Sequence, residues 1–207
     1  MRRWLQRAPW AVALMLIPAL VLAASALQPQ TRVDEWTDRY DDEFRKWTKR
    51  YFGPGLDWRW FKAQGVVESG LKPNAVSKSG SGIMQLLPRT YASIKRENPS
   101  FGAIHDARWN IAAGISYNRE NYDYWDGRVG HGEALRFTFA SYNAGPGRIR
   151  QVYDKAKNAG RDASRWVGVE KYAPRITRHY VRKIHQMMGA DVGRPSEHAI
   201  PVENPPG

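Results

Sequence analysis

Residues 68–88 read ESGLKPNAVSKSGSGIMQLLP, and this stretch predicts the end of one helix, a turn-rich loop and the start of another helix. Glu68 follows an apolar helical segment, and Gly70 suits the left-handed position that often closes a helix. Glycine and serine dominate residues 77–82, which predicts a turn, and the apolar run after them is too short for a helix. Pro88 suits the first position of the next helix. We therefore expect Glu68 at a helix end, directly before a loop.

Apolar periodicity predicts that most of the remaining chain is helical. Apolar residues recur three and four positions apart, which is typical of the buried side of a helix. We predict helices over residues 33–51, 57–69, 89–95, 110–122, 133–143, 147–159 and 174–188. Asn110 is expected to cap its helix, and Ile176 is expected on the apolar side of the last helix. The prediction is a single, mostly α domain over residues 31–189, with at most a very small β element.

The first 30 residues have the composition of a targeting segment. Three arginines precede an uncharged, largely apolar run, and Ala24-Ser25-Ala26 fits a small-x-small cleavage site. The alternative is an uncleaved anchor in the inner membrane, because residues 8–27 are just long enough to cross a bilayer. Either way, we expect the domain to be exported to the periplasm or cell envelope.

Composition restricts the chemistry and the partners. The chain has no cysteine, which excludes disulfides, a thiol nucleophile and thiolate metal sites. Its formal charge of +12 calls for an anionic partner or surface, although a solvated basic surface without a partner remains an alternative. Export argues against nucleic acid as that partner. Residues 190–207 are rich in proline and lack a hydrophobic period, so a disordered tail is expected there.

Glu68 is the candidate for acid–base chemistry. A carboxyl group at a helix C-terminus beside Val66 and Val67 experiences desolvation and the negative end of the helix dipole. Both effects favour the protonated form and raise its pKa, as a general acid near neutral pH requires. Most glycosidases pair two carboxylates. Here the nearest other candidates, Asp106 and Glu133, are interpreted as surface residues.

Four segments share an order and spacing with a known family: Glu68-Ser69, residues 77–88, residues 110–114 and residues 140–147. They resemble the catalytic domain of the soluble lytic transglycosylase (SLT) family, which belongs to glycoside hydrolase family 23 and has a goose-lysozyme-like fold. Within that family the pattern is closest to the catalytic domain of the membrane-bound F-type members. The resemblance implies a lysozyme-like domain with a substrate groove that cleaves the glycan strands of peptidoglycan.

The resemblance also implies a mechanism with one carboxyl group. Glu68 would protonate the glycosidic oxygen between N-acetylmuramic acid (MurNAc) and N-acetylglucosamine (GlcNAc), while the substrate N-acetyl group stabilises the charge at C1. The Glu68 carboxylate would then accept the proton of the muramoyl C6 hydroxyl as a 1,6-anhydro ring closes. The nucleophile is part of the substrate, which confers a high effective concentration. No cofactor is implied.

Further substrate-binding residues are assigned by their match to family motifs: Ser77, Met84, Gln85, Tyr142, Asn143 and Tyr180. Each has a plainer structural interpretation, as a turn serine, a core residue or a helix-junction residue. Two departures from the family pattern are visible. The loop from Ser77 to Gln85 is one residue shorter than usual, and Ile176 replaces an acidic residue that relatives often carry.

Two alternatives to the transglycosylase remain open from sequence. A lysozyme would use water in place of the C6 hydroxyl, and a non-catalytic peptidoglycan-binding scaffold would keep the groove without the reaction. Retention of Glu68 argues against the scaffold. A metal site is not predicted, because the five histidines lack ligand spacing.

Overall fold

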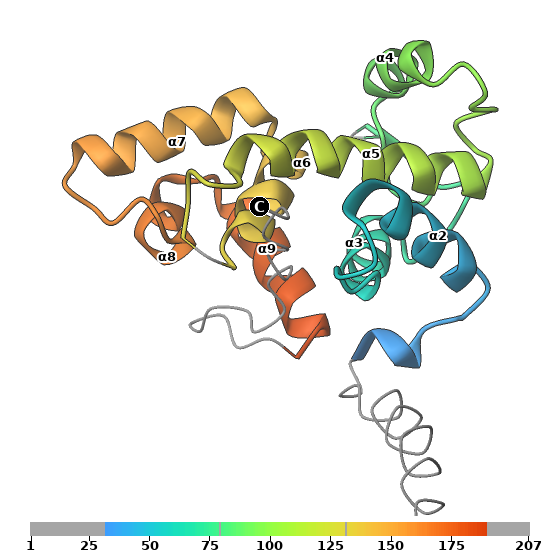
Figure 1. The fold of residues 1–207 in the computed structure, drawn as a ribbon, viewed down its shortest axis with the longest axis horizontal. Coiled ribbons are helices and arrows are strands. Elements are labelled where there is room, and N and C mark those ends of the chain that lie inside the picture. The colour runs from blue at the N-terminus through green and yellow to red at the C-terminus, as the bar shows by residue number, and fades with distance from the viewer. Residues whose placement is uncertain (1–31, 79, 131, 190–207) are drawn as a thin grey trace, which may run out of the picture. The chain divides into compact units, whose positions relative to one another are not determined.

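The computed structural model describes residues 32–78, 80–130 and 132–189, and these residues are mainly helical (Figure 1). The predicted export segment and tail lie outside them. The elements are η1 (Arg32–Glu35), α2 (Asp41–Phe52), α3 (Arg59–Ser69), β1 (Val76–Ser77), β2 (Gly80–Ser81), α4 (Pro88–Glu97), α5 (Ala107–Trp125), α6 (Ala134–Ala144), α7 (Pro146–Asn158), α8 (Trp166–Val169), η2 (Glu170–Tyr172) and α9 (Arg175–Met187). Within the described residues the strands form only one small hairpin, so the mostly α fold class is confirmed.

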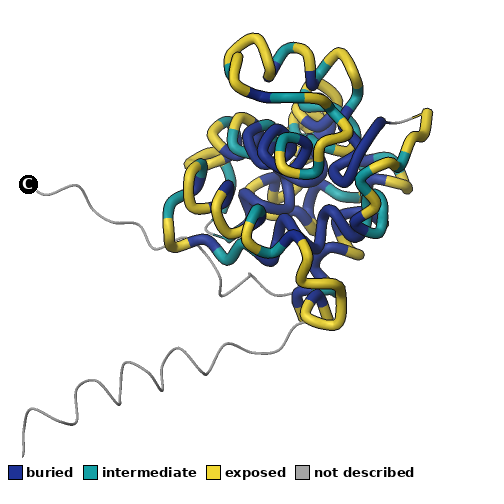
Figure 2. The backbone as a smooth tube through the Cα atoms, turned by 90° about the vertical axis from the view of Figure 1, so that its right-hand side faces the viewer, coloured by how far each residue is buried: buried dark blue, intermediate teal, exposed yellow. Residues whose placement is uncertain are grey.

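Helix α6 is the central element, and it packs against α5, α7 and α9. Every residue from Ala134 to Ser141 is buried, so this helix is covered on all sides, as its apolar composition predicts. Figure 2 shows such buried stretches in the interior of the domain, with exposed turns around them. The expectation of a buried central helix at residues 133–143 is therefore confirmed.

The prediction of one continuous helix over residues 33–51 was wrong. Val33 lies in η1 and is buried, whereas α2 starts only at Asp41. Between them the Thr37 hydroxyl accepts the Arg39 N–H at 3.3 Å. Short polar side chains of this kind compete with the helix for hydrogen bonds to backbone groups, and this competition interrupts the predicted helix. As a result, Trp36 leaves the apolar stripe and is 41% exposed.

The segment after α3 folds into a hairpin that crosses back toward the core. Strands β1 and β2 pair antiparallel, with Val76 opposite Ser81 and Ser77 opposite Gly80. Ser81 also bridges to Leu86, which brings the apolar run back beneath the hairpin. Helix α4 then begins at Pro88, as predicted.

Helix α5 begins three residues earlier than the predicted cap. Asp106 is the N-cap, and its carboxylate accepts the N–H of Arg108. The prediction that Asn110 caps this helix was therefore wrong. Asn110 lies inside the first turn and is buried, with its side chain turned toward the hairpin.

Helix α9 packs against α3 and α6 and carries the strongly amphipathic pattern expected of it. Tyr180, Val181 and Ile184 are buried, but Ile176 is 73% exposed. Its predicted place on the apolar side was wrong, because Ile176 lies in the first turn at the border of the buried stripe. Among the described residues, no helix is both long and apolar enough to cross a bilayer.

Candidate active site

Glu68 lies in the last turn of α3, where the helix is forced to stop. Gly70 adopts a left-handed conformation with φ of 63°, and its N–H donates back to carbonyls of the final turn. The Ser69 hydroxyl donates to the carbonyl of Ile83 at 2.8 Å and so ties the helix end to the loop after the hairpin. Glu68 is partly buried. The predicted helix end and its glycine are therefore confirmed.

A chain of hydrogen bonds from three helices holds the Glu68 carboxyl group. The Tyr180 hydroxyl of α9 donates to Glu68 Oε1 at 2.5 Å. Gln64 Nε2 donates to the Tyr180 hydroxyl at 3.0 Å, and Asn118 Nδ2 of α5 donates to Gln64 Oε1 at 2.7 Å. Because the Tyr180 oxygen already accepts from Gln64, its own proton is directed to Glu68. The remaining carboxyl oxygen, Oε2, is the one left to act on a ligand.

The surroundings raise the pKa of Glu68 into the neutral range, so that a substantial fraction of the carboxyl groups is protonated near pH 7. Burial raises the pKa of Glu68 from its ordinary 4.5 to about 7, and the Tyr180 hydrogen bond lowers it only in part. Burial, followed by the nearby Glu68 charge, also raises the pKa of Tyr180 well above its usual value. The phenol therefore keeps its proton and remains a donor. The direction of the Glu68 shift agrees with the expectation from sequence.

The hairpin holds Gln85 in an unusual conformation. Its φ of 45° is left-handed, which is uncommon for a residue other than glycine. The Ser77 hydroxyl donates to Gln85 Oε1 at 2.8 Å. Gln85 Nε2 donates to the carbonyls of Gly82 at 2.9 Å and Ala75 at 3.2 Å. Gln85 is thus one partner of the Ser77 hydroxyl, and these contacts hold the loop in shape.

Both backbone polar groups of Met84 form hydrogen bonds with side chains. Asn110 Oδ1 accepts the Met84 N–H at 2.7 Å, and the Tyr142 hydroxyl donates to the Met84 carbonyl at 2.8 Å. The Met84 side chain is fully buried, so direct contact with a sugar would require its neighbours to move. Gly114 makes room for it, because a Cβ at Gly114 would lie 2.7 Å from Met84 Cγ.

Tyr142 and Asn143 end helix α6 beside this loop. Burial, and then the Glu68 charge, raises the pKa of Tyr142 well above its usual value, consistent with a phenol close to the acid. Asn143 is exposed, and its Oδ1 accepts the Thr177 hydroxyl at 2.8 Å. That bond leaves the amide nitrogen of Asn143 as the group presented to a ligand.

The structure brings most of the predicted residues together. Tyr180 donates a hydrogen bond to Glu68, Tyr142 donates one to the Met84 carbonyl, and Ser77 donates one to Gln85. Sequence reasoning missed Gln64 and Asn118. A signal for both existed, since Gln64 precedes Glu68 by one helical turn and Asn118 continues the spacing of four from Asn110 and Gly114.

The other two carboxylates considered from the sequence, Asp106 and Glu133, are each engaged in holding the fold. Asp106 is exposed and caps α5. Glu133 was expected at the surface, but it is 5% exposed, which corrects that prediction. Its Oε2 accepts the N–H of Trp166 at 2.8 Å and lies 3.8 Å from Nε of Arg136. Across the described ranges no three His, Asp or Glu side chains are grouped to hold a metal ion.

Comparison with known proteins identifies the class to which this fold and site belong. The family model for the transglycosylase SLT domain matches residues 44–164. The chain therefore belongs to the transglycosylase SLT domain family, and the lysozyme-like fold expected for it is confirmed.

Individual relatives point to one branch of that family. Membrane-bound lytic murein transglycosylase F of Marinobacter nauticus is 32% identical over 142 residues, which cover 69% of this chain and 27% of that protein. The protein of the same name from Pseudomonas syringae pv. tomato is 29% identical over 145 residues, covering 70% of this chain and 28% of that protein. This chain thus spans about a quarter of the length of the curated relatives that it matches.

Two solved structures share the fold. The 70 kDa soluble lytic transglycosylase of Escherichia coli superposes with a TM-score of 0.59 at 25% identity, covering 75% of this chain and 24% of that one. An inactive mutant of the lytic transglycosylase Slt from Pseudomonas aeruginosa gives a TM-score of 0.60 at 23% identity, covering 83% and 27%.

Proposed function

We propose that this chain is a peptidoglycan lytic transglycosylase with Glu68 as its single acid–base residue. It would cleave the β-1,4 bond between MurNAc and GlcNAc and leave 1,6-anhydro-MurNAc ends. One observation carries the proposal: the Glu68 carboxyl group, with its pKa raised by burial to about 7, receives the Tyr180 hydrogen bond on Oε1. The relatives described above, which are lytic transglycosylases, support the same reaction.

In the first step Glu68 acts as an acid. Its proton, on Oε2, passes to the glycosidic oxygen as the bond from that oxygen to C1 of MurNAc breaks. The carbonyl oxygen of the substrate N-acetyl group attacks C1 and carries the positive charge. Tyr142 and Asn143 are suited to orient that N-acetyl group, because a phenol and an exposed amide end α6 beside the loop.

In the second step the Glu68 carboxylate acts as a base. It accepts the proton of the muramoyl C6 hydroxyl while O6 forms a bond to C1 and the N-acetyl oxygen leaves. Tyr180 stabilises the carboxylate between the two steps, because a hydrogen bond to the charged form lowers its energy. Glu68 is again protonated at the end, and water is not consumed.

The remaining assigned residues would shape the groove. Gln85 and Ser77 hold the hairpin loop, and Met84 supports it from within the core. We place the domain in the periplasm or cell envelope, in line with the membrane-bound relatives and the predicted export segment. Residues 1–30 would be removed as a signal peptide or, as the alternative, anchor the domain in the inner membrane through residues 8–27.

Release of soluble fragments from purified peptidoglycan tests the assignment of Glu68. The full chain should release fragments, and the Glu68→Gln variant should not. Glu97→Gln is a matched control, because Glu97 also ends a helix but is exposed. Equal activity of Glu68→Gln and the unmodified chain would refute the assignment. Binding to peptidoglycan without fragment release by either protein would favour the scaffold.

A further inference from the structure

Two buried amide side chains lie behind the contact between Tyr180 and Glu68. Gln64 and Asn118 are both 0% exposed. Gln64 donates to the Tyr180 hydroxyl at 3.0 Å, and Asn118 donates to Gln64 at 2.7 Å. Polar side chains in a core cost stability unless their hydrogen bonds repay it. Because neither amide is exposed to a ligand, any effect on the reaction must pass through Tyr180.

A backbone carbonyl at the far end sets the direction of these hydrogen bonds. Asn118 Nδ2 donates to the carbonyl of Gly114 at 3.0 Å as well as to Gln64 Oε1, so both of its N–H groups are used. A carbonyl oxygen can only accept. A rotated Asn118 amide would therefore bring its Oδ1 against the Gly114 oxygen, acceptor against acceptor. The Asn118 nitrogen is thus held toward Gly114 and Gln64.

This orientation has a cost for Asn118. Its Oδ1 is buried and has no hydrogen-bond partner among the residues that the structure describes. A buried acceptor without a partner lowers stability, and an apolar side chain of similar size at this position would avoid that loss. The cost points to a role for Asn118 other than holding the fold.

The Gln64 amide passes the orientation on to Tyr180. Because Gln64 Oε1 accepts from Asn118, Gln64 Nε2 faces Tyr180 and donates to its hydroxyl. The Tyr180 oxygen is an acceptor on that side, and its single proton is available to Glu68 Oε1. A rotated Gln64 amide would present an acceptor instead and would compete with Glu68 for the Tyr180 proton.

The direction of the Tyr180 hydroxyl decides where Glu68 carries its own proton. Oε1 accepts from Tyr180, so a protonated Glu68 carries its proton on Oε2, the oxygen left for a ligand. With the hydroxyl reversed, Glu68 would donate its proton to Tyr180, and the ligand would not receive it. We propose that Asn118, acting through Gln64, is a positioning residue that keeps the proton of Glu68 on Oε2.

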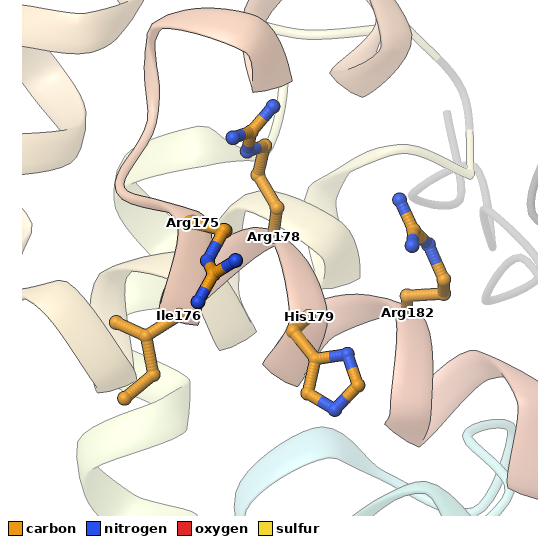
Figure 3. Close-up of a pocket in the computed structure, with 5 residues that line it drawn as sticks. All are labelled: Arg175, Ile176, Arg178, His179 and Arg182. Carbon is orange, nitrogen blue, oxygen red and sulfur yellow. The ribbon is translucent and has the colours of Figure 1, made fainter.

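Nearby charges do not exert this control. In the part of the chain that the structure describes, the titratable side chains that face Glu68 are Tyr142 of α6 and Tyr180 of α9, and the pKa of each is raised well above its usual value, so both stay neutral. Burial and the Tyr180 hydrogen bond account for the pKa shift of Glu68. Helix α9 also carries cationic side chains, which line a hollow with Ile176 and do not contribute to that shift (Figure 3): Arg175, Arg178, His179 and Arg182.

This inference rests on the proposed function, but its first test does not depend on catalysis. The ¹³C NMR signal of the Glu68 carboxyl carbon, assigned by its absence in Glu68→Gln, is followed in the full chain from pH 4 to pH 10. Asn118→Leu removes the amide at similar volume. Asn121→Leu is the matched control, because Asn121 is also buried on α5 and also donates to the carbonyl four residues earlier, at 2.8 Å.

Asn118→Leu should raise the pKa of Glu68. The released Gln64 amide competes for the Tyr180 proton, so the Glu68 carboxylate loses its donor. The alkaline limb of fragment release should move to higher pH, and kcat should fall roughly tenfold, as expected for one misdirected hydrogen bond. KM should be unchanged, because Asn118 does not contact a ligand. Asn121→Leu should leave the pKa of Glu68 as it is.

The double variant Gln64→Leu/Asn118→Leu separates positioning from packing. It removes the competing acceptor and leaves neither amide without its partner. The Tyr180 proton then returns to Glu68, so the pKa of Glu68 and kcat should lie closer to those of the unmodified chain than in Asn118→Leu. Asn118→Ser, whose hydroxyl can bond back to the helix, gives the same comparison if Asn118→Leu does not fold.

Three results would overturn the inference. One is an unchanged pKa of Glu68 in folded Asn118→Leu. Another is an equal shift in Asn118→Leu and Asn121→Leu, which would indicate a general change in the packing of α5. The third is a double variant as impaired as Asn118→Leu, since that would exclude competition by Gln64. A raised pKa in Asn118→Leu, without fragment release by the unmodified chain, would support the positioning role and refute the proposed function.

Discussion

The Tyr180 hydroxyl lies 2.5 Å from Glu68 Oε1, although the two residues are 112 positions apart in the chain. This contact joins the end of α3 to the middle of α9. It also opposes the effect of burial, because burial raises the pKa of Glu68 and the hydrogen bond lowers it. The result is a carboxyl group that can both donate and accept a proton near neutral pH.

The pH dependence of the reaction should follow the protonation of Glu68. The general acid must start protonated, so kcat/KM should fall as pH rises through about 7. An ordinary glutamate would be almost fully ionised at that pH. Fragment release measured between pH 3.5 and pH 9 checks this expectation. An alkaline limb near pH 4.5 would contradict it.

Replacing Tyr180 by Phe should move the alkaline limb to higher pH. The Tyr180 hydrogen bond stabilises the carboxylate, so its removal raises the pKa of Glu68 further. The second step should slow at the same time, because the Glu68 carboxylate loses a donor that positions it. We expect a fall in kcat of roughly 10- to 100-fold from the loss of one charge-assisted hydrogen bond and its positioning. A lower rate with an unmoved pH limb would assign Tyr180 a purely steric role.

The Glu68→Gln variant should be more stable than the parent chain above neutral pH. The folded-state pKa of Glu68 is raised, so the parent loses stability as pH rises from about 4.5 to about 7. A neutral glutamine avoids that loss. Urea unfolding at pH 8 should show a gain of roughly 1–3 kcal/mol, the shift multiplied by 1.36 kcal/mol per unit and reduced for partial exposure. At pH 4 the two proteins should have nearly equal free energies of unfolding. A stability gain of the same size at both pH values would show that ionisation of Glu68 is not its cause.

Two glycines with positive φ separate the effect of backbone strain from that of a clash. Gly82 (φ 79°) and Gly160 (φ 66°) both adopt left-handed conformations. A Cβ at Gly82 would lie 2.3 Å from Asn110 Nδ2, whereas a Cβ at Gly160 would meet no atom within 4 Å. Gly160→Ala should cost about 1 kcal/mol, from strain alone.

Gly82→Ala should cost at least about 2 kcal/mol more than Gly160→Ala, because displacement of Asn110 would leave the buried N–H of Met84 without its partner. Thermal or chemical denaturation measures both. Equal losses of stability in the two variants would show that the Asn110 side chain can move without a free-energy penalty and that the loop does not depend on its position.

Local sequence rules were sufficient for the parts of the fold that local physics decides. Gly70 and Pro88 mark the boundaries of α3 and α4, because one permits a left-handed conformation and the other lacks an N–H. The uninterrupted apolar pattern of α6 predicts its central place. The position of Glu68 at a helix end, and the direction of its pKa shift, followed from the same reasoning.

Features that depend on distant contacts were beyond such rules. Asn110 has the composition of a helix cap, yet Asp106 takes that role and the Asn110 amide clamps the backbone of Met84. The Glu68–Tyr180 contact joins helices that are remote in sequence, and its geometry depends on how α3 and α9 pack. Periodicity alone also could not show that Trp36 leaves the apolar stripe, since the break depends on a side-chain hydrogen bond of Thr37.

The most direct test of the central claim is the mass of the glycan ends that the full chain produces from peptidoglycan in water labelled with ¹⁸O. Closure of a 1,6-anhydro ring consumes no water. Anhydro-muramoyl ends without ¹⁸O are therefore expected from the unmodified chain, and they should be absent with Glu68→Gln. Reducing muramic ends that carry ¹⁸O would contradict it and identify a lysozyme instead.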